Sequence, residues 1–538
     1  MPSPTDVSDL VASAAAESPD RLALVEVGGR SLTWERLEDE VARVAHGLNR
    51  LHVVGGHRVM LVLGNRLEFV TTYLGTLRAH AVSVPVNPRT EPYDLARMIA
   101  DSGSRLIVAD ATTVASAREA VAMVQAALAG SPVPGARELE PELLARAKDP
   151  HVVVVGEGAD GETTYADLVS GPPQAFAPIA DPERLAVLLY TAGTSGRPRA
   201  AMLTHRALLA NIEQVADTDP PMMHGDDVVL GVLPLFHVYG LNAVLGSVLR
   251  HRAKLVLVDH FDPEGTLDLI DDEAISVVPV APAVFGHWVG RDQLKERLGP
   301  VRLVLSGSAV LAGEVMERFT AETGLEVHQG YGLTEAAPVV TTTMRGAPSV
   351  PGSVGRPLTG VEVRLVDEHT GHLEGDDPGE IQVRGANLFS GYWPDGADAP
   401  GEDGWWSTGD VGYHDASGDL FLVDRVRDML VVSGFNVYPS EVEDVIAEVE
   451  GVSSAAVIGV EDSTTGQAVV AYVVPDGTDR DADEVAAAVR THVETRLARF
   501  KRPSRIEVVD ALPTTVTGRV EKGRLRGIER RRALGLLE

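Results

Sequence analysis

The sequence contains no cysteine, which excludes disulfide bonds and thiol catalysis and agrees with a reducing compartment. It also lacks long apolar runs: no stretch approaches the roughly 20 uninterrupted apolar residues of a membrane-spanning helix. The first residues, MPSPTDVSDLVASAAAESPD, have neither the basic leader nor the apolar centre of a signal peptide. We therefore expect a cytoplasmic protein without integral membrane association.

Positive charge is scarce. The chain has 47 Lys and Arg against 78 Asp and Glu, which gives a formal net charge of −31. A surface this negative repels nucleic acid and anionic membranes, so we expect no nucleic acid as a partner. Any phosphate group has to be bound locally, in a pocket with glycine amides and a few placed Arg or Lys side chains.

The length points to more than one domain. At 538 residues the chain exceeds the roughly 250 to 300 residues at which single hydrophobic cores stop growing. Its 44% hydrophobic and 23% charged residues, with 53 glycines and 33 prolines, are typical of a folded, loop-rich globular protein.

Helical and strand-like patterns alternate over the first 300 residues. Leu37, Val41, Val44 and Leu48 recur at helical spacing after Thr33, a candidate N-cap. Strands that alternate with helices predict mainly parallel sheets covered on both faces. The predicted strands begin near Arg58, Arg105, His151, Leu185, Leu255, Val278 and Val301, and helices are predicted at 114–128 and from about His205.

The pattern changes after about residue 350. Turn-rich segments separate short runs such as VEVRLV and EIQVRG, which predicts antiparallel strands in a small barrel-like subdomain. The last 110 or so residues predict a compact α+β unit with helices at 440–449 and 482–497. The predicted fold class is therefore α/β, with a large body over 1–423, a hinge at 424–429 and a small α+β domain over 430–538.

A loop rich in small residues follows one predicted strand. YTAGTSGRPRAAMLTH begins at Tyr190, and its amides and hydroxyls suit phosphate and Mg²⁺, while Arg197 and Arg199 bring positive charge. Taken by itself, such a cluster is also compatible with an ordinary surface turn. Its spacing does not fit GxxxxGK[ST], which disfavours a P-loop NTPase.

This loop closely resembles YTSGTTGxPKG, the signature of the superfamily of acyl-CoA synthetases, nonribosomal-peptide adenylation domains and luciferases. Each further motif has an alternative interpretation as a turn, a charged loop or a buried histidine, but eight segments in family order indicate a member, similar to fatty-acid or 4-coumarate CoA ligases. The first seven segments are the Tyr190 loop, PLFHVYG from Pro234, SGSA from Ser306, QGYGLTE from Gln329, WWSTGD ending at Asp410, DRVRD from Asp424 and SGFNVYPSEVE from Ser433. The eighth is the C-terminal stretch that contains ARFKRP and LPTTVTGRVEKGRLR.

The resemblance implies an N-terminal AMP-binding domain, a mobile C-terminal domain and activation of a carboxylic acid by ATP. The acid attacks the α-phosphate, pyrophosphate leaves, and the acyl group passes from AMP to coenzyme A. Such chemistry depends on positioning and electrostatic stabilisation and needs no catalytic triad. The implied partners are a small carboxylic acid, ATP with Mg²⁺, and coenzyme A, and we expect a monomer or homodimer.

Site residues are implied by the same motifs. The implied catalytic residues are Thr194, Arg199, His237, Glu335 and Arg519, and Thr194 and Glu335 are also the implied Mg²⁺ ligands. Arg427 is at the implied hinge pivot and Gly434 is beside the implied pantetheine path. The implied nucleotide contacts are Thr191, Ala192, Gly193, Thr194, Ser195, Gly196, Ser308, Ala309, Gly330, Tyr331, Gly332, Leu333, Thr334, Asp410 and Arg425.

Two motifs depart from the family pattern. Arg199 and Ala200 replace the usual Lys and Gly, and Arg519 replaces the usual catalytic lysine. A planar guanidinium is not equivalent to the compact charge of lysine. Lys522 is a possible substitute three residues later. Three hypotheses remain open: a working acyl-CoA ligase, the same scaffold with a different second step, and a weakened paralogue that binds nucleotide or acyl ligands.

The acid itself is only partly indicated. PLFHVYGLNAVLG and SVVPVAPAVFGHW contain small and aliphatic residues without the aspartate that an amino-acid substrate requires. We expect a medium- or long-chain fatty acid first and an aromatic acid such as a cinnamate second. Val278 and Val280 are expected to belong to the core.

Overall fold

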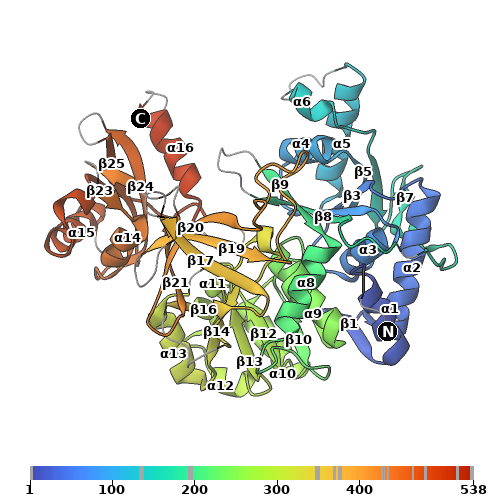
Figure 1. The fold of residues 1–538 in the computed structure, drawn as a ribbon, viewed down its shortest axis with the longest axis horizontal. Coiled ribbons are helices and arrows are strands. Elements are labelled where there is room, and N and C mark those ends of the chain that lie inside the picture. The colour runs from blue at the N-terminus through green and yellow to red at the C-terminus, as the bar shows by residue number, and fades with distance from the viewer. Residues whose placement is uncertain are drawn as a thin grey trace.

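The computed structural model describes most of the chain, and Figure 1 shows its arrangement. The N-terminal half, blue to green, and the C-terminal segment, red, lie at opposite sides of a central antiparallel sheet. The described residues are 4–131, 138–177, 179–191, 198–309, 311–345, 352–367, 371–372, 378–425, 428, 430–432, 435–462, 466–477, 481–515 and 520–533.

The first sheet is parallel except at one edge, where β8 and β9 form a hairpin. The alternation of apolar strands with helices produces it, because parallel neighbours need a crossover helix. Its order is β7 (Thr163–Thr164), β6 (His151–Val155), β5 (Ser104–Asp110), β3 (Arg58–Val62), β4 (Val82–Pro85), β8 (Leu185–Thr191) and β9 (Arg199–Thr204).

Two helices of this region agree with features predicted from the sequence, one with its N-cap and the other with its bounds. Thr33 caps α2, since its Oγ1 accepts the Arg36 N–H at 3.3 Å, and α5 spans the predicted 114–128. The helices are α1 (Asp9–Glu17), α2 (Trp34–Arg50), α3 (Leu67–Arg78), α4 (Pro92–Ser102), α5 (Val114–Leu128), α6 (Pro141–Leu144), α7 (Tyr165–Val169) and α8 (His205–Ala216).

The strand β9 was not predicted, because the segment from Arg199 was interpreted as part of a loop. Its sequence, RAAMLT, contains two alanines, which have low strand propensity. Pairing with the buried strand β8 overrides this preference, and Ala200 and Ala201 are both buried.

The second sheet is also parallel except at one edge, between β1 and β2. Its order is β14 (Val327–Gln329), β13 (Leu303–Ser306), β12 (Val277–Val280), β10 (Val228–Gly231), β11 (Lys254–Leu257), β1 (Leu22–Glu26) and β2 (Ser31–Thr33). Its helices are a π-helix (Tyr239–Gly246), α9 (Ser247–His251), α10 (Pro263–Asp272), α11 (Pro282–Trp288), α12 (Leu294–Arg297) and α13 (Gly313–Thr323).

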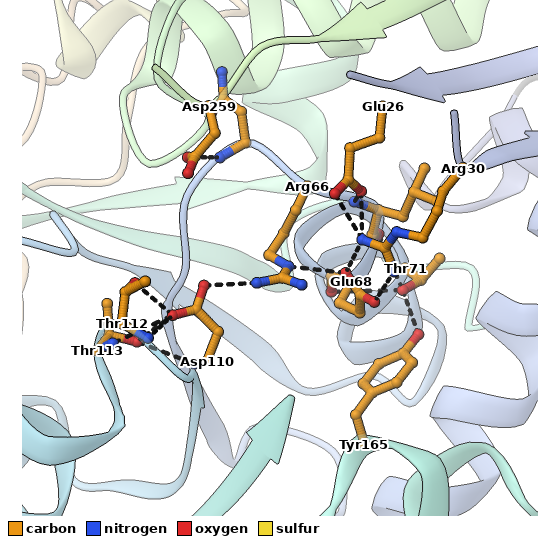
Figure 2. Close-up of polar contacts among 12 residues, drawn as sticks. Glu26, Arg30, Arg66, Glu68, Thr71, Asp110, Thr112, Thr113, Tyr165 and Asp259 are labelled. Atoms are coloured by element: carbon orange, nitrogen blue, oxygen red, sulfur yellow. Dashed lines mark hydrogen bonds and ion pairs between the residues drawn. The ribbon is translucent and has the colours of Figure 1, made fainter. Parts of the chain in front are cut away.

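A shared core and a polar network join the two sheets. Leu61 and Val187 of the first sheet belong to the same buried cluster as Leu24 and Leu255 of the second. Figure 2 shows Arg66, at the start of α3, between two acidic side chains: its Nε donates to Glu68 Oε2 at 2.9 Å and its Nη1 to Asp110 Oδ2 at 2.8 Å.

Asn65 extends this junction to the second sheet. Its Nδ2 donates to the carbonyls of Gly231 and Leu233, both at 2.9 Å, and its Oδ1 accepts the Leu235 N–H at 2.9 Å. The buried amide therefore positions the chain just before His237.

The third sheet is antiparallel, as the turn-rich region predicts. Its order is β15 (Thr341–Thr342), β16 (Ser353–Pro357), β21 (Leu420–Arg425), β20 (Trp406–His414), β19 (Gly379–Gly385), β17 (Val361–Asp367) and β18 (Gly371–His372). This sheet lies between the two parallel sheets and the C-terminal elements in Figure 1.

The C-terminal elements form an α+β unit with its own core. Ser440 Oγ, in its first helix, donates to the Val423 carbonyl of β21 at 2.5 Å. The strand order in its sheet is β23 (Phe435–Val437), β22 (Leu430–Val432), β25 (Gly466–Pro475) and β24 (Val452–Asp462). Strand β26 (Arg505–Val508) also pairs with β25. The helices are α14 (Pro439–Ala447), α15 (Ala482–Arg496), a 3₁₀ turn (Arg499–Lys501) and α16 (Lys522–Ala533). The predicted fold class is confirmed.

Candidate active site

The ends of the small-residue loop lie at the edge of the first sheet. Thr191 pairs with Arg199, and the Thr191 Oγ1 donates to the Arg199 carbonyl at 3.4 Å. The β8–β9 hairpin therefore brings the two ends of the loop, Thr191 and Arg199, next to each other. The implied contacts Ala192, Gly193, Thr194, Ser195 and Gly196 lie outside the described residues.

The segment after β14 forms a tight bend that needs two glycines. A Cβ on Gly330 would lie 2.6 Å from the Thr341 carbonyl oxygen, and one on Gly332 would lie 2.4 Å from the Pro338 carbonyl oxygen. Leu333 precedes a short 3₁₀ turn, Thr334–Ala336. Backbone atoms can therefore approach one another closely here, as the motif implies.

Tyr331 and Asp410 meet across two elements. The buried Tyr331 hydroxyl donates to Asp410 Oδ2 at 2.6 Å. Asp410 lies on β20 directly opposite Arg425 on β21. Three implied nucleotide contacts, distant in sequence, thus come together, although the Arg425 side chain is outside the description.

Glu335 is buried next to Tyr392, an aromatic residue outside the implied site motifs. The Tyr392 hydroxyl donates to Glu335 Oε1 at 2.6 Å. The Arg199 guanidinium carbon lies 3.8 Å from the centre of the Tyr392 ring, and an Arg199 nitrogen lies 2.7 Å from an Asp398 oxygen. Burial, and then the Glu335 carboxylate, raise the pKa of Tyr392, so the hydroxyl keeps its proton.

Tyr392 and Asp398 could have been found only weakly from sequence. They lie in GYWPDGAD, which was interpreted as a turn-rich spacer. The only local signal is the aromatic pair Tyr392 and Trp393 after Gly391. Nothing in the local sequence pattern relates this segment to Arg199.

The SGSA segment contributes two buried hydroxyls at the carboxyl end of β13. The Oγ atoms of Ser306 and Ser308 have no hydrogen-bond partner among the described residues. Ser308 has a φ of +74°, an uncommon conformation for a residue with a side chain, and Ala309 follows it. Such unpaired hydroxyls at a strand end fit a ligand that completes their hydrogen bonds.

His237 and Tyr239 lie next to this segment. The His237 Nδ1 accepts the Tyr239 N–H at 3.3 Å. A Cβ on Gly307 would lie 2.7 Å from the Tyr239 ring, so glycine allows the two segments to touch. Burial raises the pKa of Tyr239. Tyr239 also begins a π-helix, a feature common at functional sites.

The residues present fit magnesium nucleotide. Among the described residues, no three His, Cys, Asp or Glu side chains cluster as a metal cage. Mg²⁺ is typically held by one or two carboxylates together with substrate phosphates. The single buried carboxylate of Glu335 matches that pattern.

Arg427, Gly434 and Arg519 lie outside the described residues. Lys522, considered as a substitute for the missing lysine, begins α16 and its Nζ lies 2.9 Å from Glu443 Oε1. In this arrangement its charge is already paired within the small domain.

None of the helices in the described part of the chain combines the length and apolarity that crossing a membrane requires.

Comparisons with known proteins agree with this geometry. The model of the AMP-binding enzyme family matches residues 11–393, and that of the AMP-binding enzyme C-terminal domain matches residues 441–519. The chain is 32% identical to 4-coumarate–CoA ligase 5 of Oryza sativa subsp. japonica, over 98% of this chain and 95% of the relative.

Similar identity extends to a bacterial relative and to a solved structure. The chain is 32% identical to the long-chain-fatty-acid–CoA ligase of Bacillus subtilis, covering 96% and 94% of the two chains. ATP-bound MatB from Rhodopseudomonas palustris is 32% identical with a TM-score of 0.84, covering 97% of this chain and 99% of that one. The chain therefore belongs to the AMP-binding enzymes, the adenylate-forming family that includes the AMP-forming acid–thiol ligases.

Proposed function

We propose that this protein is an ATP-dependent CoA ligase that activates an apolar carboxylic acid through an acyl-adenylate and releases pyrophosphate. The observation that carries the proposal is the pair of contacts from one short bend. Tyr331 contacts Asp410, and Glu335, four residues later, contacts Tyr392. This segment thereby connects Asp410, whose carboxylate suits ribose hydroxyls, with Glu335, whose carboxylate suits a metal ion.

In this proposal the chain positions the reactants. Asp410 and Arg425 hold the ribose, while Tyr331, Gly332 and the Ser308–Ala309 segment accommodate adenine. The Tyr190–Arg199 loop, with Thr191 and Thr194, holds the β- and γ-phosphates. Mg²⁺, when bound at Glu335 and Thr194, would offset the phosphate charge. Arg519 would neutralise the entering carboxylate and the α-phosphate, and His237 would lie near the acyl group.

The proposed second step uses the small domain. The body comprises 1–423, the hinge 424–429 and the mobile domain 430–538. Rotation about Arg427 would bring the Gly434 segment to the pantetheine thiol of coenzyme A, so that one site serves two reactions in turn.

We propose a medium- or long-chain fatty acid as the substrate. Val278 and Val280 are fully buried and belong to the core, as expected. Phe236 and Tyr239, in the segment proposed to lie near the acyl group, are partly buried and bring no charge. The likeness to the Bacillus subtilis fatty-acid ligase supports this class. The similar identity to the rice 4-coumarate ligase favours an aromatic acid as the second candidate.

The test is pyrophosphate release from ATP and Mg²⁺ with a panel of acids, with and without coenzyme A. We expect release with apolar acids and acyl-CoA as the product. Release without any dependence of the product on coenzyme A would favour the same scaffold with a different second step. No release with any acid would favour a paralogue that only binds its ligands.

A further inference from the structure

The segment around Tyr392 is fixed against the edge of the first sheet. The Trp393 N–H donates to the Ala200 carbonyl at 2.8 Å, the Met202 N–H donates to the Gly391 carbonyl at 3.0 Å, and Tyr392 bridges to Ala201. The strand that follows the phosphate loop therefore sets the position of the Tyr392 backbone.

A tight turn requires glycine beside this residue. Gly391 has a φ of +88°, and a Cβ there would lie 2.3 Å from the Gly396 carbonyl oxygen. The same turn places Asp398 beside Arg199.

The same segment holds Glu335 at two points. The Phe389 N–H donates to the Glu335 carbonyl at 2.9 Å, and the Tyr392 hydroxyl donates to its Oε1 at 2.6 Å. The Oε2 atom accepts no hydrogen bond from the described residues. A hydrogen bond to a charged carboxylate is among the stronger ones, and it fixes the side-chain rotamer.

Two groups hold the Tyr392 ring. The Phe389 ring packs edge-on at 5.1 Å between centroids, and the Arg199 guanidinium covers the Tyr392 ring at 3.8 Å. Asp398 pairs with Arg199 but is 64% exposed, so this ion pair contributes little. A planar guanidinium stacks on an aromatic face better than an ammonium does, which gives a physical reason for arginine in the place of lysine.

We propose that Tyr392 is a positioning residue for the metal carboxylate, directing Oε2 of Glu335 towards Mg²⁺, and that Arg199 acts through the Tyr392 ring. This inference rests on the proposed function. It adds a residue to the site and gives Arg199 a role other than that of a free phosphate-binding cation.

The test measures ATP binding by calorimetry without acid substrate, once with Mg²⁺ and once with EDTA. Tyr392→Phe keeps the ring and removes only the hydroxyl. We expect its affinity for magnesium ATP to fall about tenfold, the lower end for a hydrogen bond to a charged group, while binding of metal-free ATP is unchanged. Tyr93→Phe is the matched control, because it removes a hydroxyl on α4 that donates to the Glu138 carbonyl.

A double-mutant test distinguishes a positioning role of Tyr392 from a general loss of structure. In Glu335→Gln, adding Tyr392→Phe should change magnesium ATP affinity less than twofold, because the two residues act as one unit. Additive losses, equal losses with and without Mg²⁺, or no loss in Tyr392→Phe would each overturn the proposal. A wild-type chain that bound ATP under neither condition would instead overturn the proposed function.

Arg199→Lys tests the second half of the inference. It keeps the charge and loses the planar stack, so we expect magnesium ATP binding about threefold weaker, the scale of an exposed cation–π contact. Unchanged or tighter binding would show that Arg199 does not act through the ring.

Discussion

At the scale of single residues, Arg519 stands where the resemblance implies a catalytic lysine. A lysine ammonium is a compact charge, whereas the guanidinium is wider and forks, so it fits a crowded carboxylate and α-phosphate poorly. One well-placed transition-state contact is worth on the order of 10²- to 10³-fold in rate. We expect Arg519→Lys to raise the rate of acid-dependent pyrophosphate release, on the order of tenfold.

The control is Arg524→Lys, the same exchange at an exposed position of α16, which should leave the rate unchanged. Equal rates for wild type and Arg519→Lys would mean that the arginine does not limit adenylation. Lys522 is paired with Glu443, so it should not compensate in either protein.

Asp410 combines a binding role with a structural contact. Asp410→Ala removes the proposed ribose contacts and the carboxylate to which the Tyr331 hydroxyl donates. We expect pyrophosphate release to fall at least about 100-fold, which matches the loss of about 3 kcal/mol from the contacts of a charged group. Asp160→Ala, at an exposed loop position, serves as the control. A variant with normal thermal stability and more than a tenth of the wild-type rate would contradict this role.

At the scale of elements, helix α8 begins with a fully buried histidine. The His205 Nδ1 accepts the Val7 N–H at 3.1 Å, so a proton on that nitrogen would break the bond. Burial lowers the pKa of His205 to about 4, against 6.5 in an unfolded chain. The unfolded state therefore takes up a proton first as the pH falls. The stabilisation is complete above about pH 6.5 and is lost towards pH 4, by up to about 3 kcal/mol.

Urea unfolding midpoints measured between pH 7 and 4 test this expectation. His205→Gln, whose side-chain oxygen can still accept the Val7 N–H, should flatten the pH dependence in that window. His260→Gln is the control, because the His260 side chain is 75% exposed. The same slope in wild type and His205→Gln would show that other groups cause the acid sensitivity.

Elements with a strong periodic pattern were predictable from sequence, and elements decided by distant contacts were not. The helix at 114–128 and the strand from His151 have the predicted bounds, because their apolar spacing alone specifies burial. Strand β9 and the π-helix from Tyr239 depend on neighbouring segments. The motif residues Tyr331 and Asp410 could be named in advance, but Tyr392 meets Arg199 across nearly 200 residues of sequence.

At the scale of the whole molecule, the two seven-stranded parallel sheets share one core, whereas the C-terminal unit has a separate core. Among the described residues, the Ser440 hydroxyl donates to the Val423 carbonyl of β21 across the boundary. Units with separate cores can move relative to each other. The separate cores agree with the proposal that the small domain reorients while the proposed nucleotide contacts of the body stay in place.

This arrangement predicts that the two half-reactions can be separated at the hinge. Arg427→Pro fixes one φ angle near −65° at the implied pivot and so restricts rotation there. We expect the pyrophosphate burst in a single turnover to stay within about threefold of wild type, while acyl-CoA formation slows at least about tenfold, because only the second step needs the rotation. Glu402→Pro, in an exposed loop of the body, should alter neither step. If Arg427→Pro slowed both steps equally, the small domain would act in adenylation alone, and if it slowed neither, the rotation would not pass through this residue.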